Sequence, residues 1–305
     1  METTIQVKAG KYTFIIKETS YERDGEILFT TVKMGGDYQD CINVSIDYRN
    51  NKPVSAKMPH IMYDEECAYN EPPTTTQNTS TTNKTLLEKG NGSKIMLQSM
   101  LTYIKQKYPT LTELKYDDMS SIDCATDTEI KNAVNRKRGS NVKPMSLYNL
   151  SIAYNGQTWY EKYFNGRMQN AEKYAKYRER VDILLNSKPV DFNDFIRITN
   201  VSKDLWDELF EYYKSAETYR NFFNAIPKID RCRLLQSWID AFMKHNLKGV
   251  FSNNDWIIPL GVQGGKKRTQ RKRKPQRGYV PDGIRLNHHR IISYKNNLGF
   301  TMDEL

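Results

Sequence analysis

The sequence predicts an α/β (α+β) protein with a mostly antiparallel central sheet, a C-terminal all-helical extension and a disordered basic tail. Strand-like alternation fills roughly the first sixty residues. From Gln169 onward, apolar side chains recur at helical spacing, and a dense basic run follows near the C-terminal end. We therefore expect an α/β domain over residues 1–166, a helical extension over 167–260 and a basic, flexible tail over 261–305.

The predicted sheet begins with five segments rich in β-branched and aromatic residues: TIQVKAG, KYTFIIKE, EILFTTVKM, CINVSIDY and PVSAKMPHIMY. Their partial alternation of polar and apolar side chains is typical of strands with one buried face. Residues that favour turns separate the segments, as in Asp24-Gly25 and Asn50-Asn51. These features predict an antiparallel meander of four or five strands.

Two polar stretches interrupt the middle of the chain. Residues 70–85 are rich in Thr and Asn with almost no apolar side chains, so we expect a mobile surface loop. Residues 123–144 predict a second loop. Between them, apolar residues at helical spacing in KIMLQSMLTYI predict an amphipathic helix that ends at Tyr108-Pro109, followed by the strand LTELKY. After the second loop, MSLYNLSIAY has strand character, and TWYEKYF begins a helix with a Thr158/Glu161 capping box.

The helical extension shows three apolar stripes. A stripe at helical spacing is more typical of a bundle core than of a cofactor site. The outer surface of such a bundle is available to a protein partner. The stripes include Tyr174, Val181, Leu184 and Leu185; Leu205, Trp206, Leu209, Phe210 and Tyr213; and Leu234, Leu235, Trp238, Phe242 and Met243.

The basic tail holds most of the excess positive charge. Residues 266–277 contain eight Lys or Arg, so the rest of the chain has a formal charge of +2, against +10 for the whole chain (10 − 8). Such a run can bind nucleic-acid phosphates without sequence preference or act as a nuclear import signal, or it can be a solvated arm without a dedicated partner. The candidate nucleic-acid-binding residues are Lys266, Lys267, Arg268, Arg271, Lys272, Arg273 and Lys274.

Several classes of protein are disfavoured by composition and spacing. No stretch approaches the roughly 20 apolar residues of a membrane span, and the N-terminal residues lack the pattern of a secretory signal, so we expect a soluble intracellular protein without a membrane partner. The cysteines, Cys41, Cys67, Cys124 and Cys232, are far apart without a C-x-x-C pair. This spacing signals neither a zinc site nor a disulfide framework, and it favours small buried thiols. We expect no metal site.

A Gly-x-Gly sequence precedes the first predicted helix. Unpaired backbone N–H groups and the helix dipole favour an anion at a helix N-terminus, and glycines let a phosphate approach the backbone. Gly90 and Gly92 fit this arrangement, and Ser93 can cap the helix or donate to a phosphate oxygen. The same turn is also common where a helix begins without a ligand. The Walker spacing is absent, and Ile95 breaks the dinucleotide fingerprint.

The order of meander, Gly-x-Gly turn, amphipathic helix, strand and TWYEKYF helix resembles the GNAT N-acetyltransferase family over residues 1–166. The resemblance implies that acetyl-CoA binds at residues Lys89, Gly90, Asn91, Gly92, Ser93 and Lys94. It also implies that Tyr160 protonates the leaving thiolate, although a tyrosine at the edge of the core is an equal alternative. Leu87 stands where the family has Gln or Arg. Glu66 or Glu65 can serve as the base for the amine, or can be a solvated loop charge.

Two functions follow as hypotheses. The first is an acetyl-CoA-dependent N-acyltransferase that acts on an amine. The second is a catalytically inactive GNAT-like scaffold or virion-associated protein, which binds a protein through its helices and nucleic acid through its tail. The whole chain resembles uncharacterised proteins of large cytoplasmic DNA viruses, which implies a location in the host cytoplasm, the nucleus or the virion. That resemblance supplies no activity.

Overall fold

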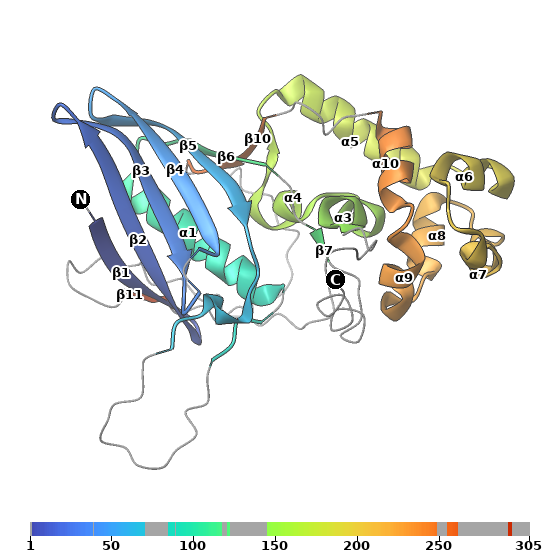
Figure 1. Ribbon diagram of the computed structural model, residues 1–305. Coiled ribbons are helices and arrows are strands. Elements are labelled where there is room, and N and C mark those ends of the chain that lie inside the picture. Colours follow the sequence, from blue (N-terminus) through green and yellow to red (C-terminus); the bar gives the residue numbers. More distant parts are fainter. Residues whose placement is uncertain are drawn as a thin grey trace, which may run out of the picture. The chain divides into compact units, whose positions relative to one another are not determined.

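The chain forms two compact units, which are described separately. The computed structural model describes residues 2–38, 40–70, 85–88, 90–117, 121–122, 145–248, 255–261 and 292–294 (Figure 1). Unit 1 comprises residues 1–116 and 259–305, and unit 2 comprises residues 117–258. Residues 71–84 of the loop predicted at 70–85 and almost all of the predicted basic tail lie outside the described residues.

Unit 1 contains a mostly antiparallel sheet, as the sequence predicts. Its first five strands form an antiparallel meander, and the parallel strands β6 and β11 pair with β5 and β1. The elements are β1 (Glu2–Ala9), β2 (Tyr12–Arg23), β3 (Glu26–Gly35), β4 (Ile42–Arg49), β5 (Lys52–Ile61), the 3-10 helix η1 (Glu65–Cys67), α1 (Asn91–Lys107), β6 (Glu113–Tyr116) and β11 (Ile292–Tyr294).

Strict alternation along β2, β3 and β4 gives the sheet one buried face. Phe14, Val32 and Val44 lie on that face and are fully buried, whereas their neighbours along each strand are partly exposed. Helix α1 packs on the buried face (Figure 1) and contributes Met96 and Met100 to the core. The predicted amphipathic helix and its end before Pro109 are confirmed.

Strand β5, helix α1 and strand β6 form a parallel crossover. Lys57 pairs with Lys115 and Met58 with Tyr116, and β5 then continues to Ile61. The carboxyl end of β5 therefore extends past its pairing with β6. In open α/β sheets, ligands bind outside the carboxyl ends of strands at a point where the strand arrangement changes. The crossover places the start of α1 in this type of position.

Unit 2 is mostly helical, with short strands. Its elements are β7 (Ser121–Ile122), β8 (Met145–Ser146), α3 (Leu147–Asn155), α4 (Trp159–Phe164), β9 (Arg167–Met168), α5 (Ala171–Asn186), α6 (Phe192–Thr199), η2 (Lys203–Leu205), α7 (Trp206–Tyr213), α8 (Tyr219–Ala225), η3 (Lys228–Asp230), α9 (Arg231–Leu235), α10 (Ile239–Leu247) and β10 (Trp256–Pro259). An aromatic cluster forms the core: the Phe195 ring lies edge-on to Trp238 at 5.0 Å, and Phe222 and Phe242 are buried beside them.

Three sequence expectations differ from this structure. Most of MSLYNLSIAY, predicted as a strand, forms α3, because its apolar side chains pack against α8 and α10. The extension predicted as all-helical contains β9 paired with β10. The units divide after Tyr116 and again after Ile258 instead of near residue 166, because α3 and α4 associate with the helical part of the chain.

Candidate functional site

The Gly-x-Gly segment begins α1, as predicted. Gly90 has φ +78°, a left-handed conformation that L side chains adopt only with strain, and Asn91 is the first helical residue. The Gly92 N–H donates to the carbonyl of Glu88 at 2.9 Å, and the Lys94 N–H donates to the carbonyl of Gly90 at 3.1 Å. The N–H groups of Gly92 and Lys94 in the first turn therefore already have helical hydrogen-bond partners. Lys89 lies outside the described residues.

An acidic side chain already lies beside this helix start. The Glu88 carboxylate accepts a hydrogen bond from the Lys11 ammonium, and the Glu88 N–H donates to the Tyr12 hydroxyl at 3.3 Å. The bond from Lys11 holds the pKa of Glu88 below its usual range, and the side chain of Asn91 contributes to this effect. Part of the positive field at the start of α1 is thus offset by the protein itself.

Gly92 also has a packing role that the sequence does not reveal. A Cβ at this position would lie 2.7 Å from Cγ of Leu87, whose side chain is only 1% exposed. Leu87 occupies the position where the GNAT family has Gln or Arg, and here it fills the space above the helix start. The small residue at position 92 therefore has a structural explanation that needs no ligand.

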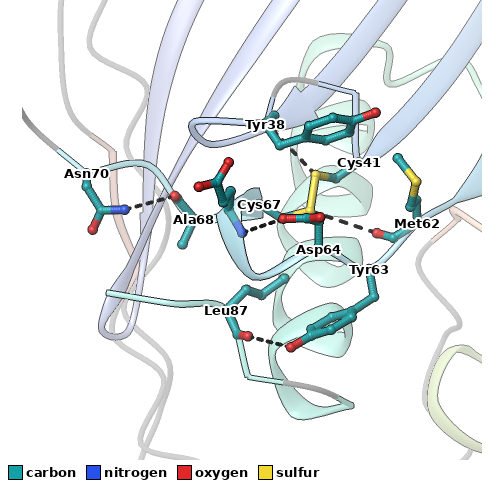
Figure 2. Close-up of a disulfide and its surroundings, with 10 residues drawn as sticks. Tyr38, Cys41, Met62, Tyr63, Asp64, Cys67, Ala68, Asn70 and Leu87 are labelled. Carbon is teal, nitrogen blue, oxygen red and sulfur yellow. Dashed lines mark hydrogen bonds between the residues drawn. A yellow bond between two sulfur atoms is a disulfide. The ribbon is translucent and has the colours of Figure 1, made fainter. Parts of the chain in front are cut away.

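The segment before α1 forms hydrogen bonds with η1 and with Tyr63 (Figure 2). The Leu87 N–H donates to the carbonyl of Glu65 at 2.9 Å, and the Tyr63 hydroxyl donates to the carbonyl of Leu87 at 3.1 Å. The candidate base Glu66 lies in the same short 3-10 helix and is exposed. The hydrogen bond from Leu87 to Glu65 thus joins η1, which carries Glu66, to the segment that leads into the Gly90–Gly92 turn.

The cysteine expectation is wrong for Cys41 and Cys67. They form a disulfide with a Cα–Cα distance of 6.0 Å (Figure 2), and both are fully buried. None of the described cysteines is a free thiol. The disulfide links the connection between β3 and β4 to η1, and the Tyr38 N–H donates to the carbonyl of Glu66 across the same junction. Their separation of 26 residues follows no motif, because pairing of this kind depends on the fold.

Tyr160, the candidate acid, lies in α4 of unit 2. The side chain is 2% exposed, and its ring lies edge-on to Trp159 at 5.1 Å. The Gly90–Gly92 turn belongs to unit 1, so a shared site with Tyr160 stays a prediction. The burial matches the alternative in which Tyr160 is part of the core. The predicted capping box is confirmed, because the Thr158 hydroxyl and the Glu161 carboxylate each accept the other residue's backbone N–H.

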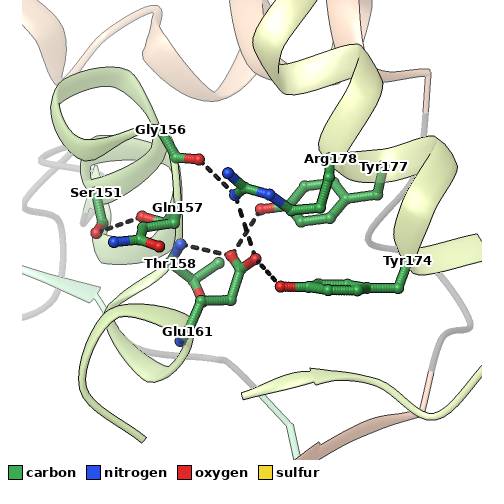
Figure 3. A network of polar contacts seen from close by, with 8 residues as sticks. All are labelled: Ser151, Gly156, Gln157, Thr158, Glu161, Tyr174, Tyr177 and Arg178. Atoms are coloured by element: carbon green, nitrogen blue, oxygen red, sulfur yellow. Dashed lines mark hydrogen bonds and ion pairs between the residues drawn. The ribbon is translucent and has the colours of Figure 1, made fainter. Parts of the chain in front are cut away.

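Glu161 also organises a buried polar network that sequence reasoning missed (Figure 3). Its carboxylate accepts hydrogen bonds from the hydroxyls of Tyr174 and Tyr177, both at 2.9 Å, and it forms an ion pair with Arg178 at 3.3 Å. Burial, followed by the negative charge of Glu161, raises the pKa of Tyr177 well above its usual value. The carboxylate is fully engaged in joining α4 to α5, so we assign it a structural role.

Three further expectations from the sequence concern nucleic-acid binding, membrane helices and metal sites. The candidate nucleic-acid-binding residues between Lys266 and Lys274 lie outside the described residues. Within the described part of the chain, no helix has the length and apolar character needed to cross a membrane. The same part contains no group of three or more His, Cys, Asp or Glu side chains arranged to hold a metal ion.

Comparison with known proteins adds no relative. No protein-family model matches the chain, and it matches neither a curated protein nor a solved structure. The resemblance to the GNAT family therefore stays a prediction based on the order of elements and on the two sequence motifs.

Proposed function

We propose that the protein is an acetyl-CoA-dependent N-acyltransferase whose cofactor binds at the start of α1. The observation that carries this proposal is the β5–α1–β6 crossover, which begins α1 with Gly90-Asn91-Gly92 beyond the carboxyl end of a parallel strand. A helix start in this position favours a pyrophosphate through backbone N–H groups and the helix dipole. The meander before it and the capped TWYEKYF helix after it add support through the family resemblance.

In this proposal the amine nitrogen attacks the thioester carbonyl and the carbon–sulfur bond breaks. Glu66 accepts the proton that the amine loses, and Tyr160 donates a proton to the departing thiolate of CoA. The role of Glu66 is supported by its exposure and by the contact of η1 with the segment before α1. The role of Tyr160 is supported by the family resemblance alone. The substrate is an amine on a protein, a polyamine or a small molecule.

A catalytically inactive scaffold is the second candidate. It is favoured by the Leu87 side chain above Gly92, by the Glu88 carboxylate beside the turn and by the burial of Tyr160. Unit 2 also exposes apolar side chains, among them Ile229 at 90% and Phe210 at 42%, that a protein partner can cover. In this case the helices and the basic tail, rather than the turn, carry the function.

Calorimetric titration with acetyl-CoA separates the two candidates. The chain and two variants with the same added charge, Ser93→Asp and Gln98→Glu, are compared. Ser93 lies in the first turn of α1, where an acidic side chain favours the helix, so Ser93→Asp adds a repulsive charge without weakening the fold. Gln98 lies further along the same helix and serves as the control. A carboxylate at position 92 is avoided, since it would collide with Leu87.

The enzyme proposal predicts saturable binding that Ser93→Asp weakens by about tenfold or more, while Gln98→Glu binds like the parent. Glu88→Gln should bind more tightly, because it removes a carboxylate beside the pyrophosphate. Absence of binding by the parent and by Glu88→Gln at about millimolar cofactor, far above typical KM values, contradicts the enzyme proposal and favours the scaffold.

A further inference from the structure

The Cys41–Cys67 disulfide lies next to the segment that leads into α1 (Figure 2). Cys67 is the last residue of η1, and the carbonyl of Glu65 in the same 3-10 helix accepts the N–H of Leu87 at 2.9 Å. Leu87 in turn packs its side chain on Gly92 in the first turn of α1. A short series of contacts therefore connects the disulfide to the start of α1. We call the arrangement with Leu87 on Gly92 the closed state.

The disulfide is a covalent anchor for η1. It joins η1 to the connection between β3 and β4, which are both paired strands of the meander. Hydrogen bonds add to this link: the Tyr38 N–H donates to the carbonyl of Glu66 at 2.9 Å, and the Glu66 N–H donates to the Asp64 carboxylate at 2.8 Å. Such bonds are exchanged for bonds to water at little net cost, and a helix of three residues is not stable by itself. We therefore expect the position of η1 to depend on the disulfide.

A reductant can reach the disulfide when η1 opens. Both cysteines are fully buried in the folded chain, and a thiolate needs access to a sulfur atom to attack it. However, η1 is a surface element, because Glu65 and Glu66 are exposed and Cys67 is the buried residue of this helix. Short exposed elements open locally without unfolding of the whole domain. Such an opening gives a small dithiol access to Cys67.

We propose that the Cys41–Cys67 disulfide is a redox switch that holds the start of α1 in the closed state, and its effect on acetyl-CoA rests on the proposed function. A dithiol transfers two electrons and two protons to the disulfide, so the S–S bond breaks, two cysteine thiols form and the dithiol becomes a cyclic disulfide. After reduction η1 opens, the hydrogen bond from Leu87 to Glu65 is lost, and the Leu87 side chain leaves Gly92.

The switch reconciles two features of the α1 start that otherwise oppose each other. The β5–α1–β6 crossover places this helix start where ligands bind, yet the Leu87 side chain fills the space above it. In the proposal, that side chain belongs to the oxidised state. Where a cell keeps thiols reduced, the disulfides that do form are usually transient and serve catalysis or redox sensing. The site would then be open under reducing conditions and closed by oxidation.

Amide hydrogen exchange without any cofactor tests the movement of Leu87. The parent is measured before and after reduction with dithiothreitol, and Cys41→Ala/Cys67→Ala serves as the reference that cannot switch. Cys232 is also disulfide-bonded, so an effect of that second disulfide would appear in the reference as well. We predict that reduction speeds exchange of the Leu87 N–H about tenfold or more in the parent and leaves the fast exchange of the reference unchanged. Unchanged exchange at Leu87 in fully reduced parent would overturn the proposal.

Titration with acetyl-CoA tests the effect on the site. Reduction should tighten binding by the parent about fivefold or more, because a larger fraction of the chain is then open. Leu87→Ala should tighten binding by the oxidised chain to a similar extent and should no longer respond to dithiothreitol. Leu86→Ala shortens the neighbouring side chain, which is 44% exposed, and should behave like the parent. Thermal melting confirms that each variant is folded. Equal affinity of the oxidised and reduced parent would overturn the proposal.

Failure of the proposed function gives a different pattern from failure of the switch. If acetyl-CoA binds in neither redox state while reduction still speeds exchange at Leu87, the switch holds and the acyltransferase proposal is wrong. If acetyl-CoA binds equally well in both states and exchange at Leu87 does not change, the acyltransferase proposal stands and the switch is wrong.

Discussion

Gly36, at the end of β3, lies against the backbone of the residue that follows η1. A Cβ at this position would lie 2.0 Å from the carbonyl carbon of Ala68, a distance that forces the backbone to move. We expect Gly36→Ala to lower the free energy of unfolding by about 1–3 kcal/mol, as overpacking does in other cores. Urea denaturation measures this effect. Gly261→Ala is the control, because its Cβ would meet no described atom within 4 Å, and equal effects would contradict the account.

At the level of single residues, the sequence identifies candidate residues by their type and position, but it does not identify the side chains that they contact. It finds Gly90 and Gly92 from their place before a helix, and it finds the capping box from Thr158 and Glu161. It does not find that Leu87 packs on Gly92, or that Glu161 binds Tyr177 at a separation of 16 residues. Both contacts depend on how the chain packs in three dimensions, which the type of residue at each position does not encode.

Among the elements, the junction of the β3–β4 connection with η1 depends on the Cys41–Cys67 disulfide. In the loop-entropy view, a crosslink over 26 residues stabilises the fold by about 3 kcal/mol. We expect reduction, or the Cys41→Ala/Cys67→Ala change, to lower the free energy of unfolding by about that amount. Peptide mass spectrometry without reductant tests the pairing first. Recovery of Cys41 and Cys67 as free thiols from oxidised protein would contradict it.

The junction between α4 and α5 should lose stability at alkaline pH. Burial and the charge of Glu161 raise the pKa of Tyr174 and Tyr177, so the folded chain retains protons that the unfolded chain releases above about pH 10. Their stabilising contribution is complete below that pH and declines as the pH rises further. Urea denaturation at neutral and alkaline pH should show a steeper decline in the parent than in Tyr177→Phe. Tyr212→Phe, outside the network, should decline like the parent.

The elements of the sheet and the first helix could be predicted because alternation and helical spacing are strong local signals. The meander and α1 are confirmed on those grounds. The helix α3 could not be predicted, because MSLYNLSIAY is short and apolar enough to suit a strand or a helix. Its packing against α8 and α10 favours the helix over the strand. Those two helices come more than 60 residues later in the chain, so no local pattern reveals the contact.

For the whole molecule, the sequence predicts the mixed α/β composition but not the division into units. Residues 259–261 return to unit 1, where the Leu260 N–H donates to the carbonyl of Thr112 at 2.8 Å. A segment that returns after the whole helical region leaves little local signal. The basic tail is evident from charge alone, whereas the contact of η1 with the segment before α1 needs the fold before its residues can be placed together.

The central claim is that the start of α1 holds the pyrophosphate of acetyl-CoA. Amide hydrogen exchange with and without acetyl-CoA tests the location directly, because a phosphate bound by backbone N–H groups slows their exchange. We predict that protection on adding acetyl-CoA is concentrated in residues 89–91 and Ser93, because the N–H groups of Gly92 and Lys94 already donate to the carbonyls of Glu88 and Gly90, and that it is absent in Ser93→Asp. Binding without added protection in those residues would place the cofactor elsewhere and contradict the account.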